Sequence, residues 1–202
     1  MPITGRTPAE CFNVFRDHLG PVLAATLGPE YPVLWRSDGK DSKKSSLALV
    51  PANSAAGVKL TSDSYRALFF SMRQNLEVVE ARDRKLWQLK TLGYKYAIYE
   101  SDGDLAEPVL RWEYASHVPQ GKKWCRHHFQ VGRIESRAIA VPFGDASLDL
   151  NRLHTPTGFV LIEYVLRFLL TELGVRPSTD DWEDVLEQSQ EKFFKDFSGR
   201  TS

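Results

Sequence analysis

The feature that most constrains the fold is a pair of alternating segments on either side of a turn sequence. In residues 94–99, aromatic and aliphatic side chains alternate with Lys95 and Ala97. The segment 109–114 also alternates: one face would carry Leu110, Trp112 and Tyr114, and the other Arg111 and Glu113. Because a period of two residues is that of a half-buried strand, and 101–104 offers Asp-Gly turn chemistry, antiparallel β-structure is predicted here.

Further strands are predicted on both sides of this region. Short candidates lie at 31–35, 47–50, 126–131 and 138–141, the β pattern is firmer from Leu86 on, and a polar loop is expected at 38–46. The segment 65–79 fits the periods of a strand and of a helix about equally well, so periodicity alone leaves it open.

Helices are predicted at both ends of the chain. Thr7, Pro8 and Glu10 form a capping box with proline at the first helical position, so a helix should run over 7–27, with a kink or a break at Gly20-Pro21. A start signal at 155–157 precedes the apolar stretch 159–173, which should be a core helix that Gly174 ends. A last helix should start at Ser178 or Thr179 and reach about 198.

Together these elements predict one α+β domain over 1–202. Its helical arm lies at about 7–27, its curved antiparallel sheet of five or six strands at about 31–141, and its C-terminal helical pair at about 156–198.

Composition excludes several classes of protein. With 42% hydrophobic residues the chain can bury a core, and 26 basic against 26 acidic residues exclude binding to nucleic acid or membrane by bulk charge. The apolar stretch 159–173 is too short to span a bilayer. The N-terminus has no apolar signal segment, and Cys11 and Cys125 lie far apart, which favours a reducing cytoplasm.

The neutral total nevertheless contains two charged poles. Residues 111–137 hold six arginines and lysines against two glutamates, a local charge of +4, and four of the five histidines fall between 117 and 154. Residues 178–198 hold two lysines against seven acids, a charge of −5. Histidines beside cations and aromatic rings are what metal-independent RNA cleavage needs, although basic strand faces are also common as plain solvated surface.

A metal site is not predicted. His127 and His128 are adjacent, so on a strand they point to opposite faces and do not share one ion. His117, His128 and Glu113 would converge only if the intervening loop folded back. No glycine-rich phosphate loop, Cys-x-x-Cys, His-Glu-x-x-His or nucleophile elbow occurs, so no cofactor is predicted either.

The segment 94–132 resembles small bacterial proteins of the TumE-like toxin type and related uncharacterised bacterial proteins. The resemblance lies in a Tyr-Lys-Tyr strand, an Arg-Trp-Glu strand, His117, and the run Arg-His-His-Phe-Gln-Val-Gly. It implies strands at 65–79 and 86–100, which decides the open segment. It also aligns His128 with the first histidine of the family's His-x-His run and Gln130 with the second. Because glutamine cannot transfer protons, a two-histidine mechanism here would need His117 or His127.

The predicted function is therefore a cytoplasmic toxin-like or defence-associated protein that acts as an endoribonuclease. His128 would be base or acid, His117 its counterpart and Arg111 the phosphate clamp. RNA would be bound by Lys122, Lys123, Arg126 and Trp112. The alternative is a non-catalytic recognition module of a toxin–antitoxin or defence complex, with an antitoxin or another complex component as its partner.

Overall fold

The computed structural model describes residues 3–29, 33–37, 43–49, 57–65, 67–81, 85–102, 107–117, 126–132, 140–143, 146–149 and 154–198. Its helices are α1 (Pro8–Thr26), α2 (Ile162–Thr171) and α3 (Trp182–Ser198). Its strands are β1 (Thr4–Gly5), β2 (Val33–Ser37), β3 (Lys44–Leu49), β4 (Val58–Leu60), β5 (Leu68–Glu80), β6 (Trp87–Tyr99), β7 (Leu110–Ala115), β8 (His127–Val131), β9 (Ala140–Phe143), β10 (Ala146–Asp149) and β11 (His154–Pro156). The predicted α+β class, with an antiparallel sheet and helices from both ends of the chain, is confirmed.

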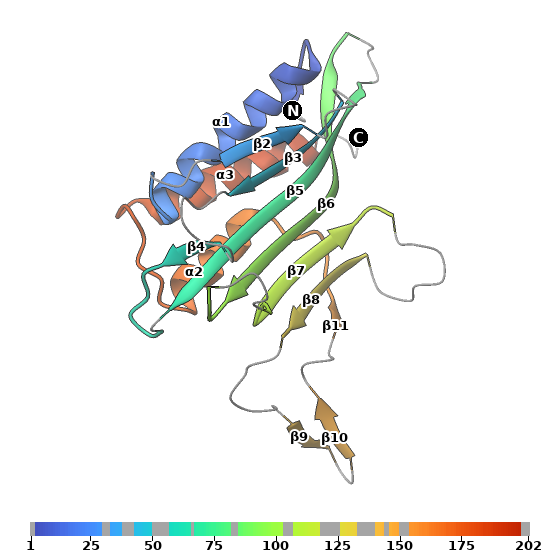
Figure 1. Cartoon of the computed structure of the whole chain (residues 1–202). Helices are drawn as coiled ribbons and strands as arrows, with labels where there is room; N and C mark the ends of the chain where they lie inside the picture. Colours follow the sequence, from blue (N-terminus) through green and yellow to red (C-terminus); the bar gives the residue numbers. More distant parts are fainter. Residues whose placement is uncertain are drawn as a thin grey trace.

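Nine of the described strands form one antiparallel sheet. The order is β11-β8-β7-β6-β5-β3-β2, with β1 added to β6 and β4 added to β5, while β9 and β10 pair separately (Figure 1). The central strands β5 and β6 confirm the choice of strand for the ambiguous segment 65–79. The prediction of five or six strands was too low, because strands of two or three residues such as β1, β4 and β11 are too short to show a period.

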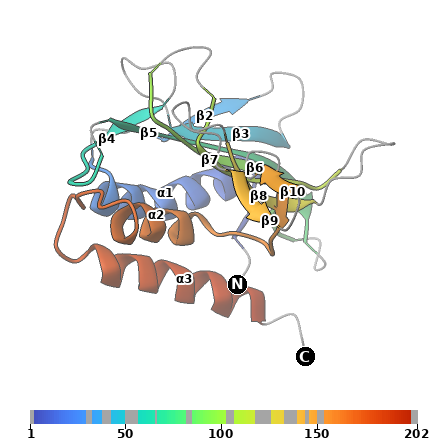
Figure 2. The ribbon, with the colours of Figure 1, turned by 90° about the horizontal axis from the view of Figure 1, so that it is seen from below.

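All three helices lie on one face of the sheet, with α3 farther from the strands than α1 and α2 (Figure 2). The core lies between α1, α2 and the sheet, where Tyr96, Phe70, Leu23 and Leu169 are almost fully buried. In the described part of the chain, the opposite face, called the outer face below, carries no helix (Figure 2). No helix in the described part of the chain is long and apolar enough to cross a membrane.

The N-terminal helix begins where its capping box predicts. The Thr7 Oγ1 accepts a hydrogen bond from the Glu10 amide at 3.1 Å, and the Glu10 carboxylate accepts one from the Arg6 amide at 2.6 Å. A kink or a break was predicted at Gly20-Pro21, and the break does not occur, since α1 is a single helix from Pro8 to Thr26. Pro21 is exposed, so its missing hydrogen bond lies on the solvent side, while the buried face of α1 stays continuous.

The C-terminal helical region begins later than predicted. Thr155 and Pro156, from the expected helix start at 155–157, belong instead to β11, which pairs with His128–Gln130 of β8. The Thr157 amide donates to the His127 carbonyl at 3.1 Å, so the residues of the predicted helix start are hydrogen-bonded to the sheet instead. Helix α2 starts at Ile162 without a side-chain cap, and its buried face confirms its place in the core.

Candidate functional site

Strand alternation divides β7 between the two faces of the sheet. Trp112 packs against Phe129 and Phe168 on the helix side, with ring centroids 5.0 and 5.4 Å away. Arg111 and Glu113, the residues on either side of Trp112, therefore point to the outer face.

The register of the sheet places charged residues of four strands in one row across the outer face. Arg73 of β5 is opposite Lys95 of β6, Lys95 is opposite Glu113 of β7, and Glu113 is opposite His128 of β8. Neighbouring strands lie about 4.8 Å apart, so side chains in such a row are within contact distance of one another.

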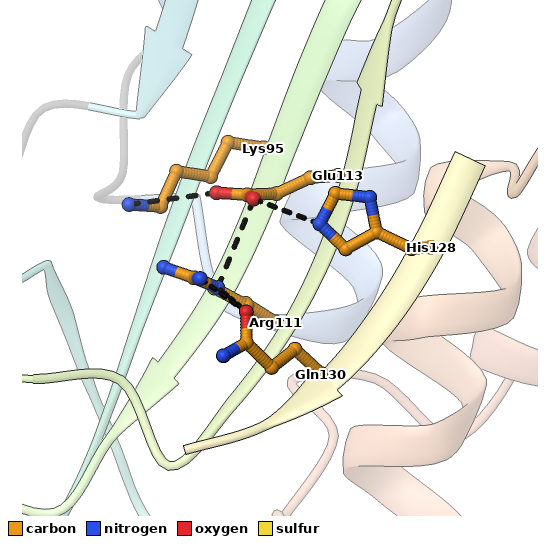
Figure 3. Close-up of polar contacts among 5 residues, drawn as sticks. All are labelled: Lys95, Arg111, Glu113, His128 and Gln130. Atoms are coloured by element: carbon orange, nitrogen blue, oxygen red, sulfur yellow. Dashed lines mark hydrogen bonds and ion pairs between the residues drawn. The ribbon is translucent and has the colours of Figure 1, made fainter. Parts of the chain in front are cut away.

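Glu113 is the centre of this cluster. Its Oε2 lies 3.2 Å from the His128 Nε2 and 3.7 Å from the Arg111 Nε, and its Oε1 lies 3.9 Å from the Lys95 Nζ (Figure 3). Arg111 also donates to the Gln130 Oε1, from Nε at 2.9 Å and from Nη2. One carboxylate thus orients two cations and a histidine.

The members of the cluster differ in exposure. The side chains of Lys95 and Arg111 are 44% and 28% exposed, whereas that of His128 is 2% exposed. The two cations can therefore meet a ligand from solvent, but His128 is covered in this conformation. A general base must come within hydrogen-bond reach of the proton that it removes, which the buried His128 does not do here.

His127 confirms the prediction that the two adjacent histidines point to opposite faces. Its ring stacks on Tyr114 at 4.2 Å and lies 5.9 Å from the Phe159 ring, on the helix side. Burial, with a smaller effect of the Arg126 charge, lowers the pKa of His127. This histidine belongs to an aromatic cluster and does not contribute to the outer face.

The structure does not bring all predicted site residues together. Arg111 and His128 both reach Glu113, whereas His117 is an exposed residue two positions past the end of β7. The predicted pairing of His117 with His128 stays a prediction.

The predicted RNA-binding residues are also dispersed. Arg126 is exposed just before β8, whereas Trp112 faces the helices and so cannot share a ligand with Arg111 on the outer face. Lys122 and Lys123 lie outside the described residues. Tyr99 of β6 is partly exposed. Alternation along the strand from Lys95 and Ala97 places this aromatic residue on the outer face.

Two members of the cluster had no predicted role. Lys95 and Gln130 became neighbours of Glu113 and Arg111 through strand pairing, and only cross-strand pairing of opposite charges could have indicated Lys95 in advance. No group of three histidine, cysteine or acidic side chains suited to holding a metal occurs among the described residues.

The outer face is basic beyond this cluster. From β3 to β8 its described strand residues include six cations, Lys44, Lys59, Arg73, Lys90, Lys95 and Arg111, and two carboxylates, Glu77 and Glu113. Six minus two leaves an excess of four positive charges. Glu77 lies 3.9 Å from both Lys44 and Lys90, so each carboxylate is already shared between cations.

The resemblance to TumE-like toxins stays a prediction. Comparison of the chain with models of protein families, with curated proteins and with solved structures gave no match.

Proposed function

We propose that this protein is a recognition module that binds single-stranded RNA on the outer face of its sheet. The observation that carries the proposal is the excess of four positive charges among the described strand residues of the outer face, in a molecule whose net charge is zero. Phosphate groups are the natural partners of such a face, and their neutralisation provides most of the affinity of non-specific RNA binding.

The polar groups beside these cations favour a single strand. Unpaired bases are recognised by stacking on aromatic rings and by hydrogen bonds to their edges, which a duplex hides. Tyr99 is the candidate for stacking, and Gln130, with its carbonyl oxygen engaged by Arg111, has an amide NH₂ group for base edges (Figure 3). In line with the resemblance described above, the module would serve a toxin–antitoxin or defence complex.

The first test measures binding of a fluorescently labelled single-stranded RNA by anisotropy across a range of salt concentrations. Wild-type protein should bind with an affinity that falls steeply with salt. The double variant Arg73→Gln, Lys95→Gln should bind more weakly, and its slope should be shallower by roughly 1.4, because each lost phosphate contact on a single strand contributes about 0.7 to the slope.

Arg16→Gln is the matched control, since Arg16 is an exposed arginine on α1, on the helix side of the sheet. This variant should bind RNA like the wild type. Equal binding by the double variant and the wild type, or no salt-dependent binding by any of them, would rule out the outer face as the RNA site.

A second candidate function is endoribonuclease activity. It is favoured by the hydrogen-bonded pair of His128 and Glu113, because a carboxylate that orients an imidazole is a common arrangement in acid–base catalysis. It stands second because His128 is 2% exposed.

If the protein cleaves RNA, His128→Ala should lower the cleavage rate by about 10²–10⁴-fold, the usual effect of removing a positioned acid or base. RNA binding should persist, because the phosphate contacts of the cations remain. The assay follows labelled RNA in a gel, with Arg16→Gln purified in parallel. Equal cleavage by His128→Ala and Arg16→Gln would assign the activity to a contaminant or to another site.

A further inference from the structure

A second polar cluster is buried between the three helices, on the side of the sheet away from the proposed RNA site. Helix α3 lies over α1 and α2 and packs mainly on these two (Figure 2). Where the three helices meet, Glu163 of α2, Ser189 of α3 and His18 of α1 come together. Glu163 and Ser189 are 3% and 5% exposed.

Ser189 joins the other two side chains. Its hydroxyl donates to the Glu163 Oε1 at 2.5 Å, and its Oγ lies 3.0 Å from the His18 Nε2. Because the single hydroxyl proton is used toward Glu163, the histidine must donate from Nε2 to Ser189. His18 Nε2 itself lies 4.0 Å from the Glu163 Oε1. Each of the three helices thus contributes one link to a continuous chain of hydrogen bonds.

The arrangement is not a catalytic triad. In a triad the carboxylate orients the histidine, whereas here Glu163 binds the serine, and the serine is too buried to meet a substrate. A carboxylic acid on an otherwise apolar helix face is also costly in its charged form. The cluster therefore suits a role in which its protonation state matters.

The surroundings of the cluster decide how it titrates. Burial raises the pKa of Glu163, and the hydrogen bond from Ser189 partly opposes this. Burial also lowers the pKa of His18, and the charge of Lys192 on α3 lowers it further. From the sheet, the buried Tyr96 of β6 faces Glu163, and its hydroxyl accepts a hydrogen bond from Gln74 at 2.6 Å.

We propose that Glu163, Ser189 and His18 form a pH-sensitive clasp that holds α3 on α1 and α2. The clasp is closed when Glu163 is protonated and His18 is neutral, and it weakens when either group becomes charged. Its opening would expose the side chain of Leu186 of α3, which is fully buried in the closed form.

The sign of each response follows from proton linkage. Glu163 has a higher pKa in the closed form than in water, so opening becomes easier as pH rises from about 4.5 to that higher value. His18 has a lower pKa in the closed form, so opening becomes easier as pH falls from about 6.5 to that lower value. Within its own window each group changes the opening equilibrium by about tenfold per pH unit, and the two effects offset each other where the windows overlap.

The experiment is amide hydrogen exchange of α3, measured from pH 4 to 8 and corrected for the intrinsic exchange rate. Two variants isolate the two groups. In Glu163→Gln only the His18 response should remain, so α3 protection should decrease as pH falls below about 6.5. In His18→Gln only the Glu163 response should remain, so protection should decrease as pH rises above about 4.5.

Two further variants separate the clasp from a general effect of charge. Glu187→Gln removes a carboxylate from the exposed face of α3, where it lies 3.8 Å from Arg167, and should keep the wild-type pH profile. Ser189→Ala removes the bond that lowers the Glu163 pKa, so the alkaline response should extend to higher pH.

The proposal is overturned if Glu163→Gln and His18→Gln have the same pH profile of α3 protection as the wild type. It is also overturned if Glu187→Gln changes the profile as much as Glu163→Gln does. Because the two central variants predict slopes of opposite sign, either one that folds is sufficient for the test.

Discussion

Glu113 is the residue on which the charged side chains of the outer face converge. Its contacts with Lys95, Arg111 and His128 hold these groups in fixed positions before any ligand arrives. An incoming phosphate would therefore compete with Glu113 for the two cations. Such competition reduces affinity, but it also makes binding depend on the ligand's geometry, because a phosphate must replace an existing acceptor.

The face on which each residue of the site lies could be predicted from the sequence. Alternation alone placed Arg111 and Glu113 together and separated His128 from His127, as the structure confirms. The contacts across strands could not be predicted this way. They depend on the register between β6, β7 and β8, and a shift by one residue would have turned every side chain to the other face.

At the scale of the secondary-structure elements, the sequence indicated the long strands and the capped helix well. The elements that it missed are short strands that form only because they pair with a neighbouring strand. Strand β11 exists because 154–156 pairs with β8, although Pro156 favoured a helix start. Proline is tolerated at such an edge, where its missing donor disrupts no second ladder.

Helix α1 provides a direct test of how local propensity acts within this fold. Gly20 lies inside the helix, and apart from its chain neighbours and the nearby helix backbone a Cβ built at this position would have no atom within 4 Å. Gly20→Ala should therefore stabilise the protein by at most about 0.5–1 kcal/mol, because alanine has less backbone entropy to lose than glycine, while the Pro21 ring crowds the Cβ of the residue before it. Urea denaturation measures the change in the free energy of unfolding.

Gly93→Ala in β6 is the matched comparison. A Cβ at Gly93 would lie 2.8 Å from the Tyr114 carbonyl oxygen, so this substitution should lower the free energy of unfolding. If both alanine variants shifted the unfolding midpoint in the same direction, the close approach of β6 and β7 at Gly93 would be contradicted.

At the scale of the whole molecule, the basic outer face and the acidic helix α3 lie on opposite sides of the sheet (Figure 2). The cations of β3 to β8 lie on the outer face. Helix α3 is the helix farthest from the sheet (Figure 2), and it carries the exposed acidic residues Glu183, Asp184, Glu187 and Glu191. The acidic helix therefore does not cover the basic strands within one chain. This separation gives a protein of zero net charge a face that attracts anions, effective over about 10 Å at 0.1 M salt.

The most direct test of the central claim is photochemical cross-linking of a 4-thiouridine-labelled single-stranded RNA to the protein, followed by mass spectrometry of the cross-linked peptides. If RNA binds the outer face, cross-links are expected in peptides of β5 to β8, with Tyr99 among the modified residues. These cross-links should be lost in the double variant Arg73→Gln, Lys95→Gln. Cross-links concentrated on α1 or α3, or none at RNA concentrations that saturate binding, would contradict the account.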